Sequence, residues 1–148
     1  MSKRGDIVSA MSTRFKAIHS GSGSYQTNLG DHVGVWRTVA LGDAELPYLN
    51  LRDPSESTVD DTQGGAVGRM TQRQLTVEIE IVCSDMTILR KCQEDVELAI
   101  HSDETFGGLA LRTQPISSEV LAVQDRDAIG GMLITVRVDY RSGRWSAS

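Results

Sequence analysis

The sequence predicts an α+β fold, a mixed, largely antiparallel sheet with two main helices packed on one face. Residues 75–83 and 132–140 alternate between apolar and polar side chains, which is typical of strands with one buried face. Two other segments, 7–18 and 88–100, carry apolar side chains at helical spacing. Because the strands come in runs between the two helices, an α+β layout is favoured over a parallel βαβ sheet.

The size and composition of the chain indicate one globular domain. It has 148 residues, 39% apolar residues and a net charge of −5, so we expect a single domain over residues 1–148. No apolar run is long enough to cross a bilayer, and the N-terminus lacks the apolar core of a signal peptide. The acidic net charge argues weakly against nucleic-acid binding. Cys83 and Cys92 match no zinc spacing and are expected to be small buried side chains.

The first half of the chain is expected to hold one helix, two strands and a long loop. The helix carries one apolar stripe, formed by Ile7, Met11, Phe15 and Ile18. Residues 32–41 are predicted to form a strand. A shorter strand is expected either to begin after Pro47, which lacks an amide hydrogen, or to lie at a sheet edge. Residues 53–68 have almost no apolar anchors, so we expect a long, mobile polar loop there.

The second half predicts a strand, a helix and two more extended segments. Ser84 is expected to cap a helix that ends near His101, and residues 109–124 look extended but are interrupted by Pro115. Strands 75–83 and 132–140 are expected to be neighbours, with the apolar faces of both meeting the helices. A polar tail is expected at about 141–148, with Trp145 as its only large apolar side chain.

The stretch His101–Gly108, "HSDETFGG", is the strongest candidate in the sequence for a metal or phosphate site. It holds a histidine, two carboxylates, two hydroxyls and a glycine pair. However, no histidine of the chain has a partner at zinc-ligand spacing, and no phosphate loop or nucleophile elbow is present. We therefore expect no catalytic, cofactor-binding or metal site and interpret the stretch as a helix-to-strand turn. A small metal- or ligand-binding domain using His101–Glu104 is the alternative.

Several stretches together resemble the tail terminator proteins of long-tailed bacteriophages, also called minor tail or tail completion proteins. They are "YQTNLGDHVGVWR", "LPYLNL", "QLTVEIEIVC" with the helix after it, "AIHSDETFGGLALR" and "MLITVRVDYRSGRW". They occur in the order of that family and cover most of the chain. Many relatives have an aliphatic residue where Phe106 stands here.

The resemblance implies a structural, non-enzymatic role in the virion tail, assembled in the host cytoplasm. Such proteins form a homo-hexameric ring that caps the tail tube, stops its polymerisation and offers a surface for head attachment. The implied partners are further copies of the chain, the major tail tube protein and a head–tail connector or neck protein. DNA would meet the protein only in passage through the ring. Another head–tail joining protein is the nearest alternative.

Interface residues are placed by position rather than carried over from the family. Asp60 and Asp61 lie in the 53–68 loop, which we expect to reach toward the tube or pore. Arg69 and Arg73, at the base of this loop, would meet acidic tube residues. The outward Glu78 and Glu80 would line a ring interface. Trp145 is an interface anchor in one interpretation, because tryptophan is enriched at interface centres. In the alternative interpretation the tail folds back and the indole covers the chain's own core.

Overall fold

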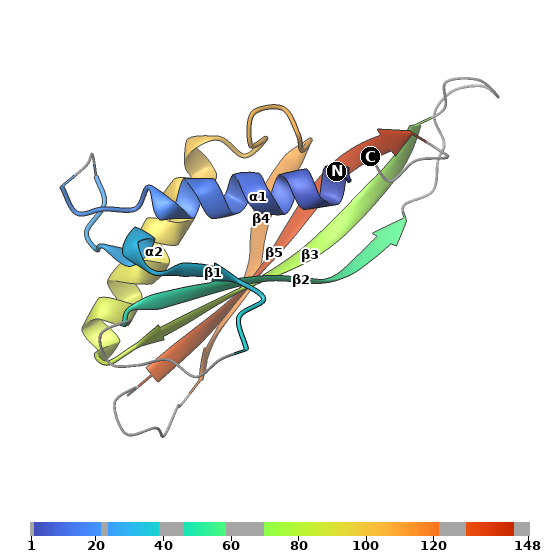
Figure 1. Cartoon of the computed structure of the whole chain (residues 1–148). Coiled ribbons are helices and arrows are strands. Elements are labelled where there is room, and N and C mark those ends of the chain that lie inside the picture. Colours follow the sequence, from blue (N-terminus) through green and yellow to red (C-terminus); the bar gives the residue numbers. More distant parts are fainter. Residues whose placement is uncertain (1, 22–23, 39–45, 59–69, 122–129, 144–148) are drawn as a thin grey trace.

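The computed structural model describes all residues except 1, 22–23, 39–45, 59–69, 122–129 and 144–148. Within these described residues lie two α-helices, one 3-10 turn and five strands in one sheet (Figure 1). In chain order they are α1 (Lys3–Lys16), η1 (Leu29–Asp31), β1 (Val33–Val35), β2 (Tyr48–Thr58), β3 (Met70–Cys83), α2 (Met86–Ser102), β4 (Arg112–Leu121) and β5 (Gly130–Gly143).

The sheet is mixed and mostly antiparallel, as the sequence predicts. The strand order is β1-β2-β3-β5-β4, and only the short β1–β2 pair is parallel. The two alternating strands, β3 and β5, are direct neighbours over their whole length, with Val77 opposite Val136 at the centre. This pairing was expected from the matching one-sided patterns.

One hydrophobic core lies between the sheet and the two helices, and Figure 1 shows both helices on the same side of the twisted sheet. The α1 stripe is buried, and Ile18 follows it into the core just beyond the helix end. The largest fully buried side chains come from both helices, the segment after α1, η1 and the inner strand positions: Tyr140, Phe15, Ile7, Met11, Ile18, Leu29, Leu49, Leu51, Leu75, Ile79, Ile81 and Leu89. Cys83 and Cys92 are buried free thiols, and burial raises the pKa of Cys92 to about 12.

The expected strand at 32–41 is shorter than predicted. It ends at Val35, and residues 39–41 lie outside the described part of the chain. Trp36 adopts a positive φ of 53° and turns the chain out of the extended run. The side-chain amide of Asn50 then forms the hydrogen bonds with the backbone N–H and C=O of Arg37 that a neighbouring strand would otherwise form. Its Oδ1 accepts from Arg37 N at 3.0 Å and its Nδ2 donates to Arg37 O at 2.9 Å.

The expected loop at 53–68 begins later than predicted. Residues 53–58 belong to β2, and Ser55–Thr58 pair with β3 beyond an irregularity between Arg52 and Ser55. Pro54 lies at this irregularity, where a missing amide hydrogen costs no ladder bond. This end of β2 is largely exposed to solvent, so its side chains are polar. The sequence therefore shows no apolar alternation there and did not predict a strand. Residues 59–68 lie outside the described residues.

Two boundaries also differ from expectation. The N-cap of α2 is Asp85, whose Oδ1 accepts from Thr87 N at 2.7 Å, and not Ser84. Both residue types are good caps, so the sequence alone did not decide between them. The strand β5 continues to Gly143, with Arg141 opposite Gln72, so the polar tail starts later than residue 141.

Candidate functional site

The face of the sheet turned away from both helices, here called the outer face, carries alternating charges. The ladder places Arg52 of β2 opposite Glu78 of β3, with Glu80 one position further along this face. The guanidinium of Arg52 lies 3.7 Å from the Glu78 carboxylate and 4.0 Å from that of Glu80. Glu78 and Glu80 therefore lie on the solvent side, as expected, and share one arginine.

The outer face also holds polar atoms with almost no solvent exposure and no hydrogen-bond partner among the described residues. These are Arg52 Nε, Arg137 Nε and Asp139 Oδ1. Arg137 and Asp139 form an ion pair within β5 at 3.6 Å, which is too long for a hydrogen bond. Both Nε–H groups therefore face a carboxylate at ion-pair distance and not at hydrogen-bond distance.

Trp36 is the largest exposed apolar side chain of the described residues, with 49% of its surface open to solvent. It lies directly after β1 beside the exposed Val35, at one edge of the sheet. Its Nε1 donates to Asp53 Oδ1 at 2.6 Å, and its backbone N–H donates to Leu51 O at 2.9 Å. A positive φ in a bulky residue costs free energy and persists only where other contacts enforce it. The indole is therefore held in an exposed position, which suits an interface anchor.

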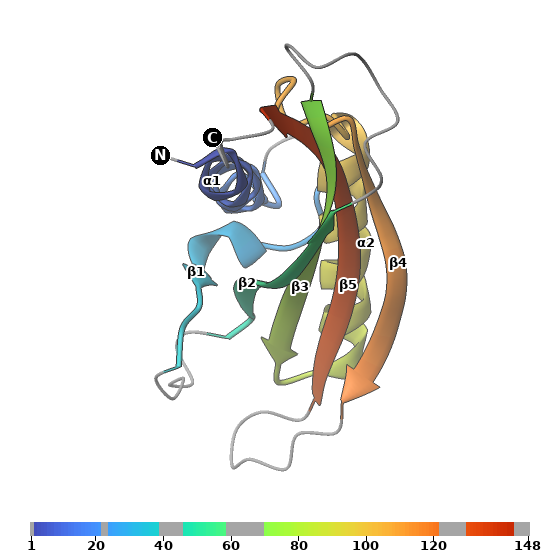
Figure 2. The same ribbon diagram turned by 90° about the vertical axis from the view of Figure 1, so that its right-hand side faces the viewer.

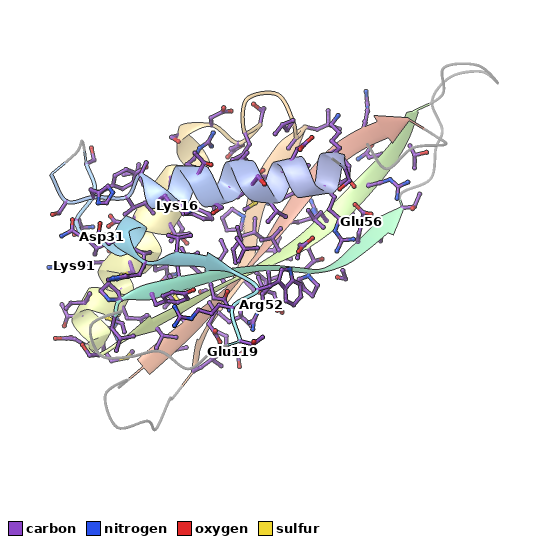
Figure 3. The ribbon with its side chains drawn as sticks, in the orientation of Figure 1. Lys16, Asp31, Arg52, Glu56, Lys91 and Glu119 are labelled. Atoms are coloured by element: carbon purple, nitrogen blue, oxygen red, sulfur yellow. The ribbon has the colours of Figure 1, made fainter. Side chains whose placement is uncertain are left out.

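A polar network joins the start of α1 to the sheet. Arg4 binds Asp53 at 2.8 Å and approaches Glu56 at 3.8 Å, and Arg73 lies 3.4 Å from the same Glu56 carboxylate. Tyr140 donates its hydroxyl to Glu56, and its burial and this bond raise its pKa well above the usual range. Glu56 lies between the N-terminal end of α1 and β2 (Figure 3). Arg73 thus faces the helix side of the sheet and contributes to an internal contact.

The stretch "HSDETFGG" ends α2 and forms the turn that leads to β4. Asp103 accepts hydrogen bonds from Thr105 N at 3.0 Å, Thr105 Oγ1 at 2.6 Å and Gly107 N at 2.9 Å. Phe106 is buried under the Arg14 guanidinium, 4.0 Å above its ring, and Arg14 also donates to Asp103 O. Phe106, Gly107 and Gly108 all have positive φ, which is why two glycines close the turn. Its polar groups are used to shape the backbone.

The Asp103 carboxyl gives this turn a measurable pH response. Hydrogen bonds from the Thr105 hydroxyl and from the Gly107 and Thr105 amides lower the pKa of Asp103 to about 2. Since the folded pKa lies below the unfolded value of about 3.9, the stabilising contribution is complete above that pH and is lost as pH falls toward 2. An NMR titration of the Asp103 side chain should show its midpoint near 2, and Thr105→Ala should raise it. A wild-type midpoint near 4 would contradict the turn geometry.

Asp95 is a buried carboxylate that sequence reasoning did not single out. It is 1% exposed and accepts from Gln26 N at 3.0 Å, Thr27 N at 2.8 Å and Thr27 Oγ1 at 2.6 Å. These bonds fix the segment after α1 onto α2. The sequence does indicate that Asp95 is buried, because it lies three residues after Cys92 and four before Ala99, within the apolar stripe of α2.

The structure brings only some of the predicted site residues together. Asp60, Asp61, Arg69 and Trp145 lie outside the described residues. His101 pairs with Glu104 at 3.1 Å on the exposed turn. Within the described ranges, no group of three or more His, Cys, Asp or Glu side chains is arranged to hold a metal ion. Among the same residues, neither helix combines the length and the hydropathy needed to span a membrane.

Comparisons with known proteins identify the fold. No family model matches the sequence, and a sequence comparison with curated proteins finds no match. The structure is similar to one chain in the solved structure "Virion of native gene transfer agent (GTA) particle", with 11% sequence identity and a TM-score of 0.53. The match covers 94% of this chain and 97% of the other, so the two share a fold over nearly their whole length.

Proposed function

We propose that the protein is a structural, non-enzymatic component of a phage-like virion, and that its role there is that of a tail terminator. In this role a ring of copies, six in related terminators, caps the tube of major tail protein, stops its polymerisation and presents a surface to the neck. The protein would be located in the virion tail after assembly in the host cytoplasm. DNA would contact it only in passage through the ring.

The shared fold with a chain of a gene transfer agent virion is the observation that carries this proposal. The match runs from end to end of both chains, so it covers the whole architecture and not a common substructure. The resemblance of the sequence to tail terminators points the same way independently of the structure. The use of "HSDETFGG" to build a turn, and not to gather ligands, also supports a structural role.

The outer face and Trp36 are the surfaces that we assign to contacts in the virion. The outer face offers the partly exposed carboxylates of Glu78 and Glu80, which share Arg52. Trp36 offers a rigid apolar anchor at the β1 edge. Asp60, Asp61, Arg69 and Trp145 stay in the proposal as contacts to the tube, on sequence grounds alone.

The proposal is tested by mixing the purified chain with the major tail protein of the same phage-like particle. We expect the chain to bind preformed tubes at their ends and to arrest their elongation, as seen by negative-stain microscopy and by light scattering. Trp36→Ala should fold normally but lose about tenfold or more in tube affinity, because aromatic anchors dominate interfaces. Leu98→Ala, which removes an exposed apolar side chain on α2, is the matched control and should bind as the wild type does.

A chain that folds and leaves both the binding and the growth of tubes unchanged would refute the terminator role. If the chain instead binds along the whole tube, it is a virion component of another kind. Normal tube capping by Trp36→Ala would remove Trp36 from the interface and leave the terminator role intact.

A further inference from the structure

The strand β4 is an exposed sheet edge. It pairs with β5 on one side, and Figure 2 shows no helix or strand beyond it on the other. The residues from Ile116 to Val120 are all exposed, and Ile116 and Val120 are 52% and 56% open to solvent. A long exposed edge with apolar side chains is a template for pairing with another strand.

The sequence of β4 is complementary to itself when read in the opposite direction. If two copies lie antiparallel with Arg112 opposite Glu119, Leu111 comes opposite Val120 at both ends of the contact. The contact between the two copies then contains two Arg–Glu pairs and two apolar pairs, each related by the two-fold axis. A slip of two residues in either direction leaves both charged residues opposite uncharged ones, so the charges select one register.

The irregularity in β4 is what makes this register possible. Arg112 and Glu119 are seven residues apart, which in a regular strand would put them on opposite faces. The ladder to β5 shifts between Pro115 and Ser117, so that Arg112 lies opposite Asp139 and Glu119 opposite Leu133. Both therefore point to the outer face, and Figure 3 shows Glu119 on the side away from α1.

The same register also matches the inner face. Thr113 and Ser118 both point to the helix side, where Thr113 lies opposite Val138 and Ser118 opposite Ile134 in β5. They come opposite one another between the two copies. Pro115 has no N–H and lies at the centre of the contact, so the backbone ladder would form in the two flanking segments and not across the middle.

We propose that two copies of this chain associate across a two-fold axis by antiparallel pairing of their β4 strands. The charge complementarity of Arg112 and Glu119 identifies a second copy as the partner. A two-fold contact of this kind is self-complementary and closes at two chains. It describes the free protein and goes beyond the proposed function, since a ring of terminators needs a different, head-to-tail interface.

Charge reversal tests this contact by sedimentation velocity and light scattering on the full chain. The wild type should give a mass of twice 16.1 kDa, whereas Arg112→Glu and Glu119→Arg should each raise the dissociation constant by about tenfold or more, because each places two like-charged pairs across the axis. An equimolar mixture of the two variants should restore the dimer, as each Glu then faces an Arg. Lys91→Glu is the matched control, because it reverses the charge of an exposed side chain on α2, away from β4. This variant should remain dimeric.

A wild type that is monomeric at every accessible concentration overturns the proposal, as does a dimer that neither variant weakens. Failure of the mixture to restore a dimer that each variant has lost also contradicts it, because both variants then act on folding and not on the contact. None of these results bears on tube capping, which is measured separately with the major tail protein. The two proposals therefore fail independently.

Discussion

Replacement of Asp95 by alanine is expected to lower the free energy of unfolding by about 3–5 kcal/mol. The carboxylate is buried and accepts hydrogen bonds from the backbone N–H groups of Gln26 and Thr27 and from the Thr27 hydroxyl. Alanine leaves these three donors without a partner at a site with little water access. It also releases the segment that covers one side of α2.

Urea unfolding followed by circular dichroism measures this effect. Glu94→Ala is the matched control, because Glu94 is the exposed neighbour and accepts a surface hydrogen bond from Gln26 Nε2 at 2.8 Å. We expect a change within about 0.5 kcal/mol for this control. If Asp95→Ala changes stability no more than Glu94→Ala does, Asp95 does not hold the segment after α1 in place.

Substitution of Gly30 by alanine is expected to cost about 2–3 kcal/mol through backbone overlap. An added Cβ at Gly30 would lie 2.7 Å from Ile18 O and 2.8 Å from the carbonyl carbon of Lys16. These are backbone atoms at the end of α1, so no side chain can rotate away. The Gly30 N–H also donates to Ile18 O at 2.9 Å, which fixes the two segments together.

The matched control is Gly21→Ala, because a Cβ there has no heavy atom within 4 Å. It should leave the thermal midpoint unchanged or raise it slightly, since alanine restricts the unfolded chain. A Gly30→Ala protein with the midpoint of the wild type would show that η1 does not pack closely against the end of α1.

The strongly patterned elements of this fold were predictable, and the ones held by side-chain bonds were not. Strict alternation in β3 and β5 and the stripes of both helices give the layer order directly. The end of β1 depends on the Asn50 amide, and the second half of β2 pairs through polar residues. The end of β1 and the second half of β2 show no regular alternation of apolar and polar residues, so the hydropathy pattern does not predict them.

The candidate site was predictable to a smaller extent. The outward direction of Glu78 and Glu80 follows from the strand period, and it holds. The exposed Trp36 was missed because the segment around it looks like a buried strand. Arg73 lies opposite Tyr140 and pairs with Glu56, and its expected contact with acidic tube residues stays a prediction. The inward direction of Arg73 follows from the period of β3, since it lies two residues before the buried Leu75. Its partners Tyr140 and Glu56 depend on the strand register, which the sequence of one strand does not define.

The location of the protein in the intact particle distinguishes a tail terminator from other virion components. Purified virions can be labelled with gold-conjugated antibody against this chain and viewed by electron microscopy. A tail terminator should be labelled at one end of each tail, where the tube meets the neck. Label along the whole tail, label on the head alone, or purified particles that lack the chain would contradict this role.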